Sequence, residues 1–135
     1  MLQREKLKMD QKTYDAGMKM RRQVAGGEYV DKAMANMTDF NRDFQRLVTQ
    51  YAWGECWGDD TLPPRERSIL NLGMLAALGK MEEFQTHLRG AMTNGMTPNE
   101  IRAVLTQISV YCGIPVGVDC FRHARPVIEA HQKKK

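Results

Sequence analysis

Glu83 and His87 are the residues of this sequence whose types and spacing best suit chemistry. They stand four positions apart in a stretch with helical periodicity, so their side chains share one face of a helix. An imidazole exchanges protons near neutral pH, and a nearby carboxylate can orient the ring or relay a proton. The spacing therefore suggests an acid–base pair, although a solvated pair on a surface helix is the commoner interpretation of these two residues alone.

Two helices joined by a tight turn are expected to position this pair, within residues 62–95. The first is apolar on nearly every face after Arg67, which is typical of a buried helix. Pro63 and Pro64 suit its start, where missing N–H groups cost little, and Gly79 can end it in the left-handed conformation. The second helix carries the acid–base pair, which is therefore expected to lie beside a buried apolar helix.

The rest of the chain is also expected to be helical. Apolar residues recur at the three- and four-residue spacing of amphipathic helices over residues 9–24, 28–37, 39–53, 101–112 and from 114 onward. Residues 54–63 are expected to form a loop, and no alternation typical of a β-strand is found. The predicted fold class is all-α, with about six or seven helices.

Caps and chain ends complete the predicted organisation. Thr38 is expected to be an N-cap, and Thr97, Pro98 and Glu100 match a capping box with proline at the first helical position. We expect a single domain over residues 9–131. It would lie between a frayed N-terminus, residues 1–8, and a Lys-rich tail, residues 132–135.

Composition argues against several classes of protein. The chain has 135 residues and is 42% hydrophobic, which suits one globular domain. No run approaches the ~18 apolar residues of a membrane span, and the N-terminus lacks the apolar core of a signal peptide, so the cytoplasm is the expected compartment. The net charge is +4, and no nucleic-acid-binding motif accompanies it. A small anion is therefore a better expected partner than nucleic acid or a membrane.

The three cysteines, Cys56, Cys112 and Cys120, form no CxxC motif. An odd number without that motif argues against a disulfide framework and against a zinc site. We expect small buried thiols in a reducing compartment, and we expect no metal.

Five segments carry a resemblance to a known family. They are WGECW at 53–57, RSILNLGMLAAL at 67–78, EFQTHLRGA at 83–91, NGMTPNEIR at 94–102 and YCGIP at 111–115. In this order and spacing, they resemble the carboxymuconolactone decarboxylase family, specifically its 4-carboxymuconolactone decarboxylase branch. The likeness extends over residues 18–129.

This resemblance implies a fold and an activity. The fold would be the all-helical one of alkylhydroperoxidase D-like proteins, assembled as a homo-oligomer, a trimer or hexamer. The activity would be cofactor-independent decarboxylation of 4-carboxymuconolactone to 3-oxoadipate enol-lactone and carbon dioxide, in the protocatechuate branch of the β-ketoadipate pathway. A family member that uses a related lactone or β-keto acid is an alternative.

A thiol-dependent peroxidase or reductase is the second alternative. The peroxidase-like relatives carry C-x-x-C-x-x-x-H on the second central helix, and placing that histidine on His87 puts the cysteine positions at Lys80 and Glu83. Neither is cysteine, so the thiolate nucleophile of that motif is missing. The Glu–x–x–x–His pattern fits the decarboxylase branch.

The resemblance also implies roles for individual residues. His87 would be the proton donor or the oxyanion stabiliser, with Glu83 supporting it, and the pKa of histidine near operating pH favours that choice. Arg67 would hold a substrate carboxylate, and Arg89 is a weaker candidate because it points to another side of the helix. Further substrate-binding candidates are Glu55, which is also an alternative proton donor, Tyr111, and Trp57, for which a packing role is the commoner interpretation.

Overall fold

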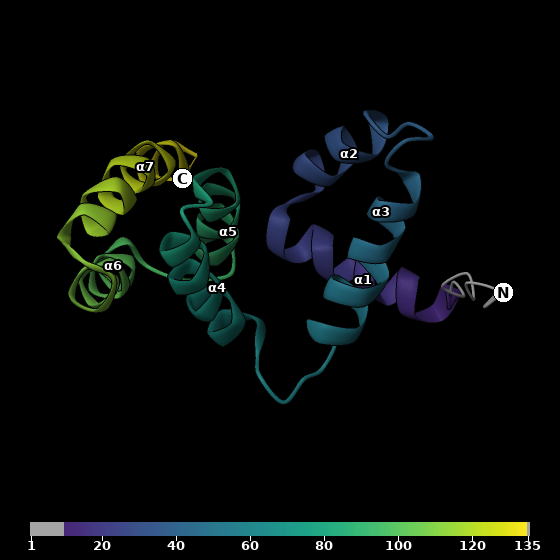
Figure 1. Cartoon of the computed structure of the whole chain (residues 1–135), viewed down its shortest axis with the longest axis horizontal. Helices are drawn as coiled ribbons and strands as arrows, with labels where there is room; N and C mark the ends of the chain where they lie inside the picture. The colour runs from purple at the N-terminus through teal and green to yellow at the C-terminus, as the bar shows by residue number, and fades with distance from the viewer. Residues whose placement is uncertain (1–9, 135) are drawn as a thin grey trace, which may run out of the picture. The chain divides into compact units, whose positions relative to one another are not determined.

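The computed structural model describes residues 10–134, which form helices joined by short turns and loops, with no β-strand among them (Figure 1). The all-α fold class is thereby confirmed. Backbone packing divides the chain into two compact units, residues 1–61 and residues 62–135, which are described separately. This division leaves the prediction of a single domain over residues 9–131 untested. The predicted frayed N-terminus, residues 1–8, lies outside the described residues.

Residues 10–61, the described part of the N-terminal unit, form three α-helices and one π-helix. They are α1 (Gln11–Ala25), α2 (Gly27–Ala35), α3 (Arg42–Leu47) and η1 (Val48–Cys56), and α1 packs along η1. Asp10 caps α1 by accepting hydrogen bonds from the backbone N–H groups of Lys12 and Thr13. Gly26, with a φ of 96°, separates α1 from α2, a conformation in which a side chain would be strained.

Two predictions about this unit are wrong. Residues 54–56 belong to η1 and not to a loop, because the helix that begins at Arg42 continues without a break through Cys56. The N-cap of α3 is Asn41 and not Thr38. Asn41 accepts a hydrogen bond from the backbone N–H of Thr38 at 2.8 Å, so the stretch between them is a turn that precedes the helix.

Close approach of α1 and η1 holds the N-terminal unit together. A Cβ atom at Gly17 would overlap the carbonyl oxygen of Thr49, and one at Gly54 would overlap that of Thr13. Beside this contact, the buried Arg21 donates hydrogen bonds to Gln45 at 3.0 Å and to the hydroxyl of Thr49 at 3.1 Å. The backbones of α1 and η1 therefore lie in close contact. The buried guanidinium of Arg21 beside this contact has hydrogen-bond partners, as buried polar groups usually do.

The C-terminal unit is a four-helix arrangement of α4 (Pro64–Leu78), α5 (Met81–Thr93), α6 (Pro98–Cys112) and α7 (Ile114–Lys133). The predicted cap signals are confirmed. Gly79 ends α4 with a φ of 71°, and the Thr97–Glu100 capping box starts α6 with Pro98 in its first turn. Because α7 continues through Lys133, the predicted Lys-rich tail begins inside a helix.

An ion pair ties the start of α4 to the start of α6. Arg65 donates hydrogen bonds to both carboxylate oxygens of Glu100, one of them at 3.3 Å. The guanidinium lowers the pKa of Glu100 to about 2, with help from the backbone N–H of Thr97. The carboxylate of Glu100 thus completes the capping box of α6 and also holds the first turn of α4 beside it.

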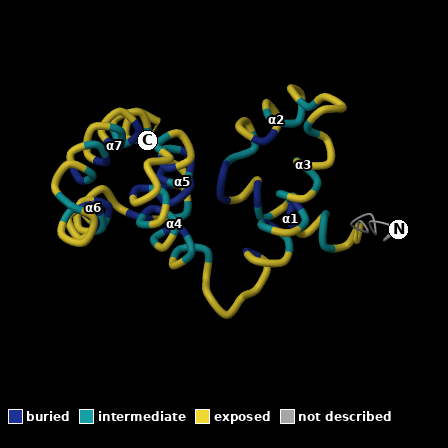
Figure 2. The backbone as a smooth tube through the Cα atoms, viewed as in Figure 1, coloured by how far each residue is buried: buried dark blue, intermediate teal, exposed yellow. Residues whose placement is uncertain are grey.

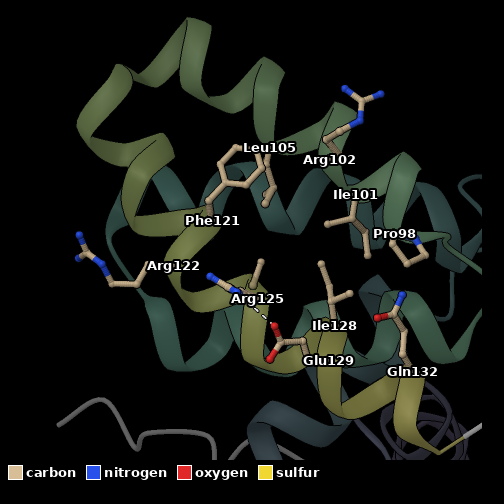
Figure 3. A pocket seen from close by; sticks show the side chains of 11 residues that line it. Pro98, Ile101, Arg102, Leu105, Phe121, Arg122, Arg125, Ile128, Glu129 and Gln132 are labelled. Atoms are coloured by element: carbon tan, nitrogen blue, oxygen red, sulfur yellow. Dashed lines mark hydrogen bonds and ion pairs between the residues drawn. The ribbon is translucent and has the colours of Figure 1, made fainter.

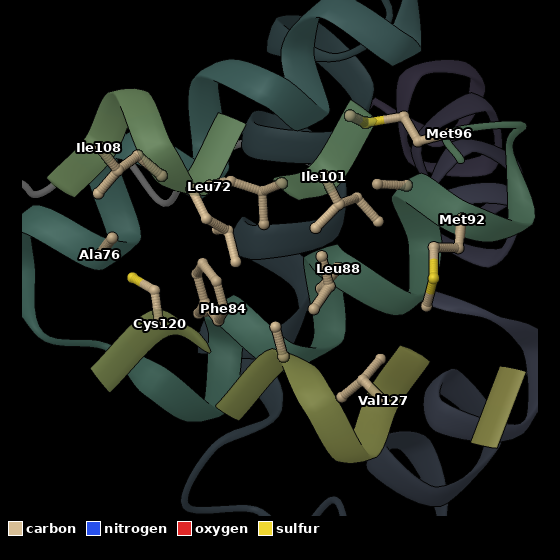
Figure 4. Close-up of a cluster of buried hydrophobic side chains, with 13 residues drawn as sticks. Leu72, Ala76, Phe84, Leu88, Met92, Met96, Ile101, Ile108, Cys120 and Val127 are labelled. Carbon is tan, nitrogen blue, oxygen red and sulfur yellow. The ribbon is translucent and has the colours of Figure 1, made fainter. Parts of the chain in front are cut away.

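The core of the C-terminal unit gathers side chains from all four helices (Figure 4). Phe84 and Leu88 of α5 are fully buried against Leu72 of α4 and Ile101 of α6. The expectation that α4 is buried on every face is wrong, because Leu70, Met74 and Leu78 are 52%, 46% and 70% exposed. Figure 2 shows buried and exposed residues interleaved along the chain. The second helix of the pair, α5, supplies more of the core than α4 does.

No helix among residues 10–134 is both long enough and apolar enough to span a bilayer.

Candidate active site

His87 lies on α5 where that helix faces α4. Its ring is half-buried, and the Nδ1 atom is 3.5 Å from Nδ2 of Asn71 on α4. The two helices pack against each other along their lengths, so the contact is set by the same packing that buries Phe84 and Leu88. The structure thereby adds Asn71, a residue that sequence reasoning missed. A signal for it exists, because Asn71 is the one polar residue between Ser68 and Gly79.

Burial makes His87 a neutral side chain at neutral pH. Loss of hydration lowers the pKa of His87 to about 4, and the negative charge of Glu83 opposes this shift only in part. The argument that the pKa of His87 lies near operating pH is therefore wrong for the ligand-free chain. A neutral imidazole can still donate one hydrogen bond and accept another, which suits an oxyanion stabiliser better than an imidazolium acid.

Glu83 lies on the same face of α5 as His87, as predicted, but it is exposed. The contact with Nδ1 of the ring comes from Asn71, so Glu83 influences His87 through its charge. An anionic carboxylate one helical turn from the imidazole stabilises any positive charge that develops on the ring.

The neutral state of His87 predicts a pH-dependent stability. The pKa is about 4 in the folded chain and 6.5 in the reference state. Above pH 6.5 both states are neutral, whereas between pH 6.5 and 4 the unfolded chain binds a proton that the folded chain does not. The free energy of unfolding should therefore fall by up to about 3 kcal/mol over this interval. Urea denaturation of wild type and His87→Gln at pH 7.5, 5.5 and 4.5 measures it. An equal fall in both proteins would contradict the assignment.

Arg67 lies on α4 one helical turn before Asn71 and is half-buried. Residues four apart share a helical face, so α4 carries a guanidinium and an amide on one side. The exposed Met74 and Leu78 continue that side toward the end of the helix. An anionic ligand near His87 would thus meet one fixed cation and an apolar strip on the same helix.

Two other predicted residues of the C-terminal unit lie apart from this cluster. Arg89 is exposed and donates a hydrogen bond to the hydroxyl of Thr86 at 3.2 Å. Tyr111 is 83% exposed and lines a groove of about 410 Å³ between α4 and α6, together with Leu70 and Met74. His87 is not among the residues that line this groove.

Glu55 and Trp57 belong to the N-terminal unit, so their part in the site stays a prediction. Trp57 is 7% exposed and packs against Trp53, with ring centroids 4.9 Å apart. It is a member of the apolar core of this unit, which agrees with a packing role. Glu55 is exposed in the last turn of η1.

A second groove, of about 550 Å³, lies between α6 and α7 (Figure 3). Its floor is apolar, with Ile101, Leu105 and Ile128. Arg125 at its edge pairs with Glu129 at 3.0 Å. None of the predicted site residues lines it.

The cysteines differ from expectation. Cys56 and Cys112 are exposed and only Cys120 is buried, where burial raises the pKa of its thiol to about 11. Within the part of the chain that the structure describes, no three His, Cys, Asp or Glu side chains are placed to share a metal ion.

Comparison with known proteins assigns the family. The model of the carboxymuconolactone decarboxylase family matches residues 42–126, and this chain belongs to that family. It is 34% identical over 120 residues to 4-carboxymuconolactone decarboxylase of Acinetobacter baylyi, covering 89% of this chain and 90% of that protein. It is 40% identical over 107 residues to nitrosuccinic acid decarboxylase of Metarhizium robertsii, covering 79% and 75%. A 4-carboxymuconolactone decarboxylase sequence of Pseudomonas putida is 46% identical over 48 residues, which are 35% of this chain and all of that sequence.

Proposed function

We propose that this chain is a carboxy-lyase that converts 4-carboxymuconolactone to 3-oxoadipate enol-lactone and carbon dioxide without a cofactor. The observation that carries the proposal is the half-buried, neutral imidazole of His87 held between α4 and α5 in a chain of this family. The similarity to two proteins named for this reaction supports the choice of substrate.

The reaction needs an electron sink, and the substrate contains one. Its departing carboxylate is attached to a saturated ring carbon next to the double bond, and that double bond is conjugated to the lactone carbonyl. Loss of carbon dioxide moves the electron pair into that carbonyl and makes a dienolate, which is then protonated on carbon. The protein must therefore bind carboxylates, stabilise the developing oxyanion and allow a proton to reach carbon.

The residues between α4 and α5 match the first two needs. A neutral imidazole can donate its N–H to an enolate oxygen, and it acts most strongly where water is scarce. Arg67 supplies a planar cation for a substrate carboxylate. When a dianionic substrate binds nearby, its charge raises the pKa of His87, so proton delivery by this residue also becomes easier in the complex.

The relative named nitrosuccinic acid decarboxylase, which is 40% identical to this chain, suggests a second class of substrate. Nitrosuccinic acid has a nitro group on a carbon that bears a carboxylate, and loss of carbon dioxide there leaves a nitronate. Both reactions place an electron pair on an oxygen of the substrate and both substrates carry two carboxylates. The same donor and cation would therefore serve either reaction.

Parallel assays distinguish these substrates. Purified protein is given authentic 4-carboxymuconolactone or nitrosuccinate, and carbon dioxide and the organic products are resolved over time. We expect kcat/KM for the lactone to exceed that for nitrosuccinate by at least about a hundredfold, a difference of about 2.7 kcal/mol. The reverse preference, or no turnover of the lactone, would contradict the proposed function.

Arg67→Ala should raise KM for the lactone about 10- to 100-fold, because hydrogen bonds to charged groups contribute about 1.5–3 kcal/mol. If the guanidinium binds ground and transition states equally, kcat changes little. Arg89→Ala is the matched control, since Arg89 is exposed and contacts Thr86, and its KM should remain that of wild type. Equal KM values for the two variants would show that Arg67 does not bind the substrate carboxylate.

We also propose that the protein works as a homo-oligomer, a trimer or a hexamer. Large apolar side chains are exposed on three helices of the C-terminal unit, namely Leu70, Met74, Leu78, Val110, Tyr111, Ile114, Val118 and Phe121. Such a concentration of exposed apolar surface is typical of an interface. A second copy of this chain is always present with the first, and we propose that it covers this apolar surface.

Sedimentation at micromolar concentration should give a species well above the 15.5 kDa of one chain. Met74→Glu, which places a charge in the apolar strip of α4, should shift it toward smaller species, because an unpaired charge is costly in an interface. Thr106→Glu adds the same charge at an exposed position of α6 that lines neither groove and should leave the assembly unchanged. A wild-type monomer at this concentration would contradict the proposal.

A further inference from the structure

Asn71 is an unusual residue for its position in α4. It stands in the middle of the helix, within the run from Ile69 to Leu78 that is otherwise apolar or glycine. Asparagine is a poor former of helix interiors because its amide competes for backbone hydrogen bonds. A half-buried amide also loses hydration and needs a partner. Its Nδ2 atom lies 3.5 Å from Nδ1 of His87, so the residue is placed to act on the ring.

The orientation of this contact favours one position for the proton of the neutral ring. The structure turns Nδ2, the donor side of the Asn71 amide, toward Nδ1 of His87. An amide NH₂ group only donates hydrogen bonds, so this orientation favours a lone pair on Nδ1. With Nδ1 as the acceptor, the single proton of the neutral ring lies on Nε2. The remaining hydrogen-bond donor of His87 is therefore the nitrogen on the opposite side of the ring.

His123 on α7 provides a contrast within the same unit. Its Nδ1 atom lies 2.8 Å from the carbonyl oxygen of Asp119 and 3.2 Å from the carboxylate of that residue. Oxygen acceptors require a proton on the facing nitrogen, so the Nδ1–H form is favoured there. The environments of His87 and His123 thus select opposite tautomers, and each histidine is a reference for the other.

We propose that Asn71 is a positioning residue that holds His87 in the Nε2–H tautomer, so that the ring presents a hydrogen-bond donor to the substrate oxyanion. The inference about the oxyanion rests on the proposed decarboxylase function, whereas the tautomer is a property of the protein without substrate. A ring in the other tautomer would turn a lone pair toward the developing negative charge, which would repel it.

The tautomer is measured on the whole wild-type protein with ¹⁵N-labelled histidine, by long-range ¹H–¹⁵N correlation spectra at pH 7.5 without substrate. His87→Gln assigns the signals. We expect a pyridine-like Nδ1 and a pyrrole-like Nε2 for His87, and the reverse pattern for His123. A pyrrole-like Nδ1 in His87 would overturn the proposal, and this result needs no variant of Asn71.

Asn71→Asp replaces the donor with an acceptor of nearly the same shape. The new carboxylate on α4 would join Glu83 on α5 in favouring a protonated ring, against the positive charge of Arg67 one turn away on α4. At a pH where the spectra show a singly protonated ring, we expect the proton of His87 to move from Nε2 to Nδ1. Nε2 then turns a lone pair toward the substrate and kcat should fall at least about tenfold, since wrong tautomers cost up to about 10⁴-fold in catalytic triads. KM should change less, because Arg67, the proposed cation for the substrate carboxylate, is unchanged. An unchanged tautomer in this variant would overturn the proposal.

Asn99→Asp is the matched control. Asn99 lies in the first turn of α6, where it accepts a hydrogen bond from Arg102 through Oδ1 at 3.0 Å, and aspartate keeps that bond. In the Asn99→Asp variant, the tautomer of His87 and kcat should both be those of the wild-type protein. If the tautomers are as expected but the lactone is not turned over, the proposed substrate fails and the positioning role stands. If the lactone is turned over by a wild-type enzyme whose His87 carries its proton on Nδ1, only the positioning role fails.

Discussion

His87→Ala should lower kcat for 4-carboxymuconolactone by about 10²–10³-fold, the usual cost of removing one donor from an oxyanion site. The expectation follows from the neutral, half-buried ring and from its place between α4 and α5. KM should change less, because the enolate charge is present in the transition state and absent from the bound substrate.

His87→Gln distinguishes the two roles that the imidazole can have. Glutamine keeps an N–H donor but cannot exchange a proton near neutral pH. If His87 stabilises the oxyanion, the glutamine variant should recover part of the activity that alanine loses. If His87 delivers the proton, both variants should fall together, by about 10²–10⁴-fold. The lowered pKa favours the first result.

Two further variants complete this kinetic test. Glu83→Gln should cost less than His87→Ala, because Glu83 is exposed and acts on the ring through its charge. His123→Gln replaces a half-buried histidine whose Nδ1 is bonded within α7 and should keep wild-type kcat. Oligomer size and folding are checked for each protein first. Wild-type kcat in a folded, assembled His87→Ala would make the assignment wrong, and Glu55 would be tested next.

Local signals explain why much of the fold was predictable. A glycine in the left-handed conformation at Gly79 and a capping box at Thr97 depend on residues within one turn, so the sequence contains all the information needed to place them. The apolar periodicity of α5 likewise predicts its buried face, because Phe84 and Leu88 recur at helical spacing.

Features that depend on neighbouring helices were not predictable in the same way. Helix α4 is apolar on nearly every face after Arg67, yet Leu70 and Leu78 are exposed in the single chain. The three neighbouring helices of the unit cover only part of its surface. The continuation of α3 into a π-helix was missed for a related reason. Gly54 is a helix breaker by propensity, but here it lies in η1 and lets that helix approach α1.

The candidate site was predictable in its residue types but not in its contacts. The spacing of Glu83 and His87 places both on one face, as the structure has them. The partner of the ring, Asn71, is 16 positions away in sequence, and only the packing of α4 on α5 brings it within reach. The depressed pKa of His87 has the same origin, because desolvation is a property of the packed structure.

Gly17→Ala should destabilise the N-terminal unit by at least about 3 kcal/mol, the upper part of the usual range for overpacking. A Cβ atom at this position would overlap the backbone carbonyl of Thr49 in η1 and would also meet the backbone of Gly54. Backbone atoms cannot rotate away as a flexible side chain can, so α1 and η1 would have to separate. Separation would also weaken the hydrogen bonds that Arg21 makes across this contact.

Tryptophan fluorescence during urea denaturation measures this effect selectively, because both tryptophans of the chain, Trp53 and Trp57, lie in the N-terminal unit. Gly27→Ala is the matched control within the same unit. Its Cβ would meet only the end of the flexible Arg22 side chain at 3.7 Å, so it should be neutral or slightly stabilising, as helical alanines are. A Gly17→Ala transition at the same urea concentration as that of Gly27→Ala would mean that α1 and η1 do not pack backbone to backbone.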